Sequence, residues 1–325
     1  MLSEVREQAR GVAYLRKVVA NQCKIPLLLV GDEGVGKRFS VLEAIKEDFS
    51  DGNPSDKQCL QVARGVHPDL TLLASSGGKE IGIEEMRGAL EEAKTYPTVA
   101  RRRYIVIDGA DQLTEPAANA VLKTLEEPPK VVRFILLANS IERVIPTIVS
   151  RCGEVRYNRL SEAFITSTLS QLTDDPMKVL VYTRLSEGSV GRAVQFLGSN
   201  RISFRNRVLD ILKMALTGDL SSLFAAIDDM LPEKKSTEQK DSELLLAIRF
   251  LEHLVLDLLL IPHAPDRITN MDLREELTVL CEKIGHTRLS ALRREISVAQ
   301  DRSSHAKVSL HHQVKNCFSV AFSQR

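Results

Sequence analysis

The chain has 325 residues, with 44 lysine and arginine residues against 43 aspartate and glutamate residues, for a formal net charge of +1. That length is enough for two or three domains, and the near-zero charge excludes a global field drawing the whole chain to nucleic acid or membrane. The five cysteines lie far apart without a CxxC pair, so neither a disulfide framework nor a zinc site is encoded, and no zinc is expected.

Residues 4–21 follow the spacing of an amphipathic helix, and residues 25–30 form a compact apolar run typical of a strand. The strand leads into GDEGVGK at residues 31–37, and a helix is expected from about residue 38 to 49. A strand, a GxxxxGK loop and a helix in this order predict a P-loop, whose backbone N–H groups hold phosphates. The expected phosphate-binding residues are Gly31, Gly34, Gly36 and Lys37.

Arg38 occupies the eighth position of the P-loop motif. This position should carry Ser or Thr, because their hydroxyl group ligates Mg²⁺. A guanidinium carries only donors and cannot ligate a cation. The sequence therefore predicts a P-loop whose metal site is damaged.

Residues 50–58 are polar and predict a loop, and residues 81–96 have strong helical periodicity. His67 is a lone histidine before Pro68, for which a structural role is expected. The run Arg101, Arg102 and Arg103 precedes a buried strand. We interpret it as a solvated flank, with contact to a phosphate backbone as the alternative.

Residues 104–107 form a short β-branched strand that ends at Asp108. A hydrophobic strand ending in aspartate is the Walker B pattern, which places a carboxylate near nucleotide-bound Mg²⁺. A helix is expected to start near Glu115 and to end before Pro128 and Pro129. The Walker B pattern alone is not specific, because many strands of α/β proteins end in aspartate.

A second buried strand is expected at residues 131–138, followed by Asn139, and Ser-Arg-Cys stands at residues 150–152. The rest of the chain is mainly helical in pattern, with a charged loop expected at residues 232–241 and a break at 261–265. The most apolar stretch, residues 244–261, carries its polar side chains on one face. It predicts a buried amphipathic helix, not a membrane span, and the protein is expected to be cytoplasmic.

The undecapeptide NAVLKTLEEPP at residues 119–129 closely resembles the signature of AAA+ clamp-loader subunits. The chain most resembles the delta-prime type of bacterial DNA polymerase III, with motifs from about residue 5 to 200. The resemblance implies an α/β fold followed by all-α domains. The parts implied are an AAA+ P-loop parallel-sheet domain at residues 1–157, a small helical lid domain at 158–202 and a helical collar domain at 203–325.

The same resemblance implies roles for several motif residues. Asn139 matches sensor 1, where an amide orients the attacking water, and Arg151 matches an arginine finger presented in trans to the nucleotide of the adjacent subunit. The alternative for Arg151 is a surface arginine that caps the helix from Pro146. In GSVGRA at residues 188–193, Gly191 takes the place of the sensor 2 arginine, and Arg192 lies about 100° further round the helix.

Two departures favour delta-prime over the motor subunit. Arg38 replaces the Mg²⁺-binding hydroxyl, and Gly109 replaces the Walker B glutamate. We expect the guanidinium of Arg38 to pair with Asp108. Cys59 stands where the last zinc ligand of the family would be, and without its partner cysteines it is interpreted as a vestigial buried thiol.

The resemblance therefore implies a stator, a subunit that completes a neighbour's ATP site without turning over ATP itself. The implied partners are other clamp-loader subunits in a hetero-oligomeric ring, the sliding clamp, and primed DNA through the complex. ATP binding by this chain stays open. Two alternatives remain: an active AAA+ ATPase, and a DNA-binding module using a basic carboxy-terminal segment. That segment's basic residues include Arg288, Arg293, Arg294, Arg302, Lys307 and Lys315.

Overall fold

The computed structural model describes residues 1–53, 55–75, 80–217, 220–229, 237–305 and 310–323. The chain divides into two compact units. The first unit contains Met1–Ser161 and Gly188–Arg192, and the second contains Glu162–Glu187 and Ala193–Arg325. The expected division into three domains, with boundaries near residues 157 and 202, remains a prediction.

The first unit is built on a five-stranded sheet with the strand order β2-β3-β4-β1-β5. All four strand pairs are parallel, as expected when helices connect successive strands. The strands are β1 (Leu27–Val30), β2 (Leu70–Ala74), β3 (Arg103–Asp108), β4 (Val132–Ala138) and β5 (Gly153–Arg156). The central strands β1 and β4 are buried along their whole length, because helices cover both faces of the sheet.

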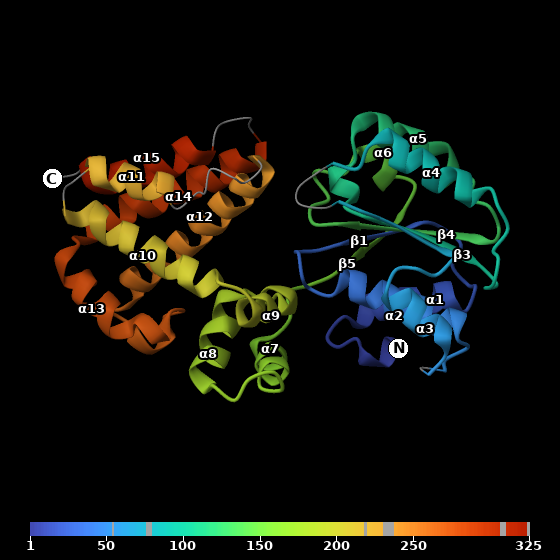
Figure 1. The fold of residues 1–325 in the computed structure, drawn as a ribbon, viewed down its shortest axis with the longest axis horizontal. Helices are drawn as coiled ribbons and strands as arrows, with labels where there is room; N and C mark the ends of the chain where they lie inside the picture. The colour runs from blue at the N-terminus through green and yellow to red at the C-terminus, as the bar shows by residue number, and fades with distance from the viewer. Residues whose placement is uncertain (54, 76–79, 218–219, 230–236, 306–309, 324–325) are drawn as a thin grey trace. The chain divides into compact units, whose positions relative to one another are not determined.

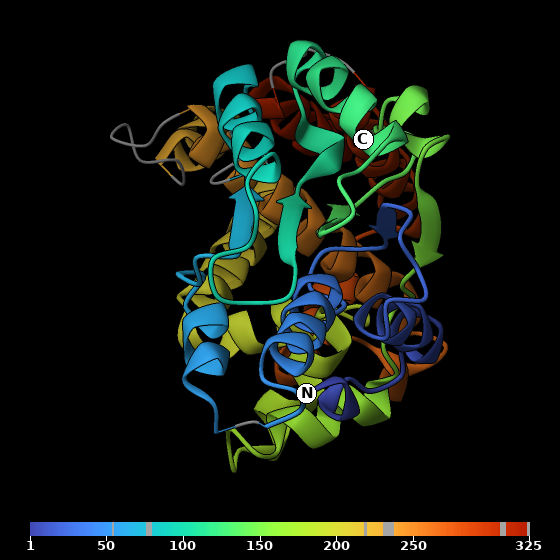
Figure 2. The ribbon, with the colours of Figure 1, turned by 90° about the vertical axis from the view of Figure 1, so that its right-hand side faces the viewer.

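Alternate residues of β1 enter two different cores. Leu27 and Leu29 pack with α1 (Ala9–Val19), α2 (Lys37–Phe49) and α3 (Lys57–Ala63), whereas Leu28 and Val30 pack on the opposite face. That opposite face is covered by α4 (Ile83–Ala93), α5 (Glu115–Glu126) and α6 (Pro146–Val149). Figures 1 and 2 show α1 and α2 on one side of the strands, with α4 and α5 on the other.

The helix that carries the clamp-loader signature starts where the sequence predicts. Thr114 caps α5, its side chain accepting a hydrogen bond from the backbone N–H of Ala117, and Pro116 lies in the first turn. Ala117, Val121 and Leu125 are buried against the sheet. These contacts fix α5 behind the strand that ends at Asp108.

The second unit is helical. Its elements are α7 (Glu162–Leu169), α8 (Pro176–Leu185), α9 (Val190–Gly198), which begins in the first unit, α10 (Arg201–Thr217), α11 (Leu220–Asp229), α12 (Thr237–Leu260), α13 (Arg274–Lys283), α14 (His286–His305) and α15 (Leu310–Ser323), with short 3₁₀ turns η3 (Pro265–Arg267) and η4 (Met271–Leu273). The long helix α12 packs against α10, α14 and α15 (Figure 1). Leu254, Val255 and Leu258 of α12 are fully buried, so this helix forms the centre of the unit's core.

The predicted fold class, α/β followed by helical structure, is confirmed. The predicted helix over residues 4–21 is instead a short turn η1 (Leu2–Glu4) followed by α1, because the chain bends at Glu7, whose φ is 56°. The edge strands β2 and β5 and the helix α3 were not predicted. Residues 237–241, expected in a charged loop, begin α12, and residues 232–236 of that loop lie outside the described residues. No helix in the described part of the chain could cross a membrane.

Candidate P-loop and arginine site

The predicted P-loop connects β1 to α2. Gly34 and Gly36 adopt left-handed backbone conformations, with φ of 77° and 97°, which glycine reaches at little cost. The Nζ of Lys37 donates to the backbone oxygens of Gly31 and Asp32, the latter at 2.9 Å, and to Oδ1 of Asn139 at 3.0 Å. The structure therefore brings the P-loop lysine and the expected sensor 1 amide into direct contact.

Lys37 is largely buried in this position. Burial lowers the pKa of its ammonium, and nearby carboxylates, Asp108 foremost, offset that effect only in part. A buried cation among backbone carbonyls and N–H groups has the chemistry to hold a phosphate, because the phosphate supplies the missing negative charge.

Arg38 and Asp108 form the ion pair that the sequence predicted. Nη1 of Arg38 lies 3.4 Å from Oδ2 of Asp108. Burial raises the pKa of the Asp108 carboxyl, and the positive charges of Arg38 and Lys37 compensate only partly. The cation that faces the Walker B carboxylate is thus a side chain of the protein.

These residues do not fit a bound Mg²⁺. Arg38 offers no ligand oxygen, and its positive charge lies against the carboxylate that the metal would need. Within the described residues, no group of three or more His, Cys, Asp or Glu side chains is arranged to hold a metal ion.

Gly109 occupies a backbone conformation that a glutamate tolerates poorly. Its φ is 118°, in the region that L-residues rarely adopt, and a Cβ atom there would lie 3.2 Å from Oγ of Ser75 and 3.3 Å from its Cβ. Both the backbone conformation at position 109 and the nearby Ser75 side chain therefore disfavour a glutamate there.

The segment at residues 188–192 packs directly on the P-loop. The backbone N–H of Gly191 donates to the oxygen of Gly34 at 3.0 Å, and Oγ of Ser189 donates to the oxygen of Glu33 at 2.8 Å. A Cβ atom on Gly191 would lie 2.9 Å from Cα of Gly34, closer than atoms of this kind approach. With this backbone, no arginine can occupy the sensor 2 position, and Arg192 is itself buried.

Arg151 follows α6 at the surface of the first unit. Its Nη1 donates to the backbone oxygen of Thr147 at 3.0 Å, and its Nη2 lies 3.4 Å from Oε2 of Glu126 in the signature helix. The side chain is 30% exposed. The contact with Thr147 is the helix cap that the sequence offered as the alternative.

Burial raises the pKa of the adjacent Cys152 thiol to about 12, because the thiolate would lose its hydration. This cysteine is therefore unreactive at neutral pH. Cys59 is buried as well, with Sγ 3.5 Å from the backbone oxygen of Asn53, in agreement with the predicted buried thiol.

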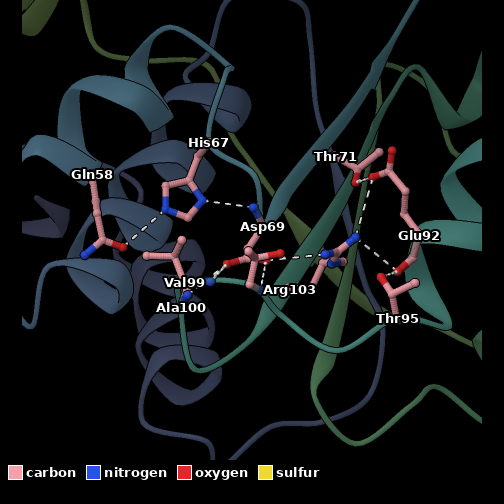
Figure 3. A network of polar contacts seen from close by, with 10 residues as sticks. Gln58, His67, Asp69, Thr71, Glu92, Thr95, Val99, Ala100 and Arg103 are labelled. Atoms are coloured by element: carbon pink, nitrogen blue, oxygen red, sulfur yellow. Dashed lines mark hydrogen bonds and ion pairs between the residues drawn. The ribbon is translucent and has the colours of Figure 1, made fainter.

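A buried polar network that sequence reasoning missed surrounds Asp69 (Figure 3). The Asp69 carboxylate accepts hydrogen bonds from the backbone N–H groups of Thr98, Val99 and Ala100 and pairs with Arg103. His67 accepts the backbone N–H of Asp69 on Nδ1 and contacts Gln58 through Nε2, which confirms a structural role for this histidine.

The arginine run before β3 is mostly internal. Arg102 pairs with Asp48 and donates to the backbone oxygens of Val18 and Val19, and Arg103 is buried beside Asp69. Only Arg101 is well exposed, where it pairs with Asp51. The expected solvated flank is therefore wrong for Arg102 and Arg103, because their guanidinium groups compensate buried acids and carbonyls.

A family model described as "DNA polymerase III, delta subunit" matches residues 8–161. The delta′ subunit of DNA polymerase III from Escherichia coli (strain K12) is 30% identical over 237 residues, covering 72% of this chain and 67% of that protein. The chain belongs to the delta′-type AAA+ clamp-loader subunits.

Two further comparisons extend this assignment. Replication factor C subunit 4 of Homo sapiens is 28% identical over 215 residues, covering 61% of this delta′-type subunit but only 55% of the human protein. A DNA polymerase III gamma subunit-related protein from Thermotoga maritima has a solved structure that matches 96% of this chain and 98% of its own, with a TM-score of 0.50 and 16% identity. The last likeness concerns the fold alone.

Proposed function

We propose that this delta′-type subunit is a stator of a sliding-clamp loader in DNA replication, which donates Arg151 to the ATP site of a neighbouring subunit. In this role the chain does not hydrolyse ATP itself. The P-loop residues Gly31, Gly34, Gly36 and Lys37, together with Asp108 and Asn139, form a degenerate nucleotide site, in which Arg38 stands in for the metal.

The observation that carries the proposal is the contrast between two arginines. Arg38, whose side chain is 50% exposed, pairs with Asp108 beside the chain's own P-loop, whereas Arg151, 30% exposed, lies at the end of α6 beside Glu126. A planar guanidinium offered from a neighbouring subunit stabilises the negative charge that develops on a transferring phosphoryl group. In this proposal Arg38 takes the place of the metal at the chain's own P-loop, and Arg151 serves the site of the neighbour.

Steady-state ATPase of the reconstituted complex tests the role of Arg151. Arg151→Ala should lower turnover at the served site by a factor on the order of 10³. The matched control is Arg143→Ala, an exposed arginine nearby with no ion pair in the described part of the chain, which should leave turnover unchanged. Equal turnover of the Arg151→Ala complex and wild type, with unchanged assembly, would refute the finger role.

An active ATPase is the second candidate, and one observation favours it. The P-loop keeps its glycine conformations, and Lys37 still contacts Asn139. ATPase of the pure chain in Mg²⁺, with and without primed DNA and clamp, separates the candidates. If the chain is a stator, the ATP turnover of the pure wild-type chain should not exceed that of the Lys37→Ala variant. Turnover that the Lys37 substitution abolishes would establish the ATPase instead.

The partners follow from the same proposal. The chain would assemble with other clamp-loader subunits into a hetero-oligomeric ring, act on a sliding clamp, and meet primed DNA through the complex. The cytoplasmic location expected from the sequence is part of this proposal. Purification from the native source under gentle conditions tests it, since clamp-loader subunits should be recovered with the chain in stoichiometric amounts.

A further inference from the structure

A basic groove in the second unit is not accounted for by the stator role. It is an open groove of about 480 Å³ between the end of α12 and the face of α14, two helices that pack side by side (Figure 1). The lining residues are Leu259, His286, Ser290, Arg293, Arg294 and Ser297. The five from α14 recur at intervals of three or four residues, with Arg293 and Arg294 adjacent, so they form one face of the helix.

The positive charge of this groove is not neutralised within the protein. Arg293 and Arg294 are exposed and form no ion pair with any described residue. The acid that follows them, Glu295, does not line the groove. Lys315 differs from them, because it pairs with Asp228 at 2.8 Å.

Other members of the predicted basic segment do not contribute to the argument. Arg288 is half-buried and already engaged in an interaction within the protein. The side chain of Arg302 and all of Lys307 lie outside the described part of the chain. The polar chemistry of the groove therefore comes from the two adjacent arginines and the serines beside them.

The types of residue that line the groove favour one class of ligand over the others. Small-molecule sites are mostly apolar, and protein interfaces need an apolar or aromatic centre, but Leu259 is the single apolar residue that lines this groove. Single-stranded nucleic acid is held by successive bases stacking on several aromatic rings, and the imidazole of His286 is the single aromatic ring in this lining. Arginine guanidinium groups, serine hydroxyls and a helix N-terminus are the groups that contact the phosphates of a duplex.

We propose that this groove binds the sugar-phosphate backbone of duplex nucleic acid without reading its sequence. The face from His286 to Ser297 extends roughly 16 Å along the helix axis, which is long enough to meet more than one phosphate of a strand. Arg293 and Arg294 neutralise phosphates, and Ser290 and Ser297 donate neutral hydrogen bonds on either side. The net charge of +1 restricts this contact to the groove.

Fluorescence anisotropy of the full chain with a duplex of about 20 base pairs, between about 50 and 200 mM salt, tests the groove. The variant carries Arg293→Ala with Arg294→Ala. Its control carries Arg10→Ala with Arg16→Ala, which removes the same charge from exposed positions of α1. Circular dichroism confirms that both double variants fold.

In the α14 variant, the slope of log K against log salt should become less steep by about 2, since two fewer counterions are released on binding. Its affinity near 0.1 M salt should fall on the order of 10- to 100-fold, with little change in the α1 control. Equal losses in both variants, or no salt-dependent duplex binding by wild type, would overturn the proposal. So would tighter binding of poly-glutamate or of single-stranded DNA than of the duplex, because the groove would then serve an acidic protein or an unpaired strand.

Discussion

Two aspartates at opposite ends of the same strand pair differ in almost every physical respect. Asp69 immediately precedes β2, and Asp108 is the last residue of β3, which pairs with β2 from Leu70 against Tyr104 to Ala74 against Asp108. Asp69 is fully buried, and Asp108 is half-buried. Burial alone would make Asp69 the costlier charge.

Asp69 is nevertheless the better stabilised carboxylate. Burial opposes its ionisation, but three backbone N–H groups at 2.6 to 2.8 Å and the charge of Arg103 outweigh that cost, and its pKa lies below the ordinary range. Among the described residues the Asp108 side chain has one hydrogen-bonding partner, Arg38 at 3.4 Å, and burial holds its pKa above the ordinary range. The number and direction of hydrogen-bond donors, more than depth, decide whether a buried acid stabilises this fold.

Asp69 is a structural acid, whereas Asp108 stands at the position of the expected Walker B carboxylate. The donors around Asp69 come from the loop before β3, so its charge holds that loop in place (Figure 3). Asp108 stands at the P-loop end of the sheet, where a phosphate-binding site would add a metal. Arg38 compensates for that missing charge incompletely.

The largest expected effect is on Asp69. Asp69→Asn should lower the free energy of unfolding by about 3–5 kcal/mol, because the buried Arg103 keeps only the more distant, exposed Glu92 at 3.9 Å and an amide donor replaces an acceptor facing backbone N–H groups. Urea unfolding at neutral pH measures it. Asp51→Asn, which breaks the exposed pair with Arg101, is the control and should change stability by less than about 1 kcal/mol. Similar losses in the two variants would contradict the contrast.

The pH dependence of the same variant sharpens this prediction. Because the folded pKa of Asp69 is lowered, its stabilisation is present above the unfolded pKa and is lost as the pH falls through the folded pKa. The gap between wild type and Asp69→Asn should therefore narrow on acidification below about pH 4. A gap that stays constant from neutral pH to pH 3 would mean that the carboxylate charge is not the cause.

A smaller loss is expected beside Asp108. Gly109→Ala should destabilise the protein by about 1–2 kcal/mol, since the left-handed φ and the close Ser75 side chain both disfavour a Cβ atom. Thermal or urea unfolding measures it. Gly88→Ala, inside α4 with open space around its Cβ position, should instead stabilise by about 0.5–1 kcal/mol. Stability of Gly109→Ala equal to wild type would show that position 109 relaxes freely, and a glutamate there would then be tolerated.

Replacing Asp108 should change the free energy of unfolding in the opposite direction to replacing Asp69. Because burial raises the folded pKa of Asp108, its ionised form costs stability above that pKa, and this cost disappears as the pH falls through it. Asp108→Asn should stabilise the protein at neutral pH by no more than about 1 kcal/mol. A clear destabilisation at neutral pH would indicate that the Arg38 pair is stronger than its 3.4 Å separation implies.

The smallest effect on stability is expected for Arg38→Thr, but it should change ligand behaviour. The substitution restores a hydroxyl beside Asp108, so nucleotide binding, where present, should become dependent on Mg²⁺. Calorimetric titration in Mg²⁺ and in EDTA, on wild type and variant, measures this. Strong wild-type binding that collapses in EDTA would contradict the stand-in role of Arg38, and hydrolysis by the variant should still require a base at Gly109.

The sequence alone determined the elements whose signals are contiguous. The P-loop follows from a strand, a glycine-rich loop and a helix in succession, and the family follows from NAVLKTLEEPP and the Arg151 motif. Even the Arg38–Asp108 pair was predictable, because two motifs of known relative placement supplied its members. Each of these inferences needed only local spacing and the chemistry of the side chains.

The tertiary structure decided what depends on backbone placement. The donors to Asp69 are backbone N–H groups some thirty residues away, and such groups are present in every sequence and carry no signal. The contact of Gly191 with Gly34 and the φ of Gly109 depend on how distant segments meet, and so does the groove along α14. These features arise when folding brings separate elements within a few ångströms, which local patterns of residues do not encode.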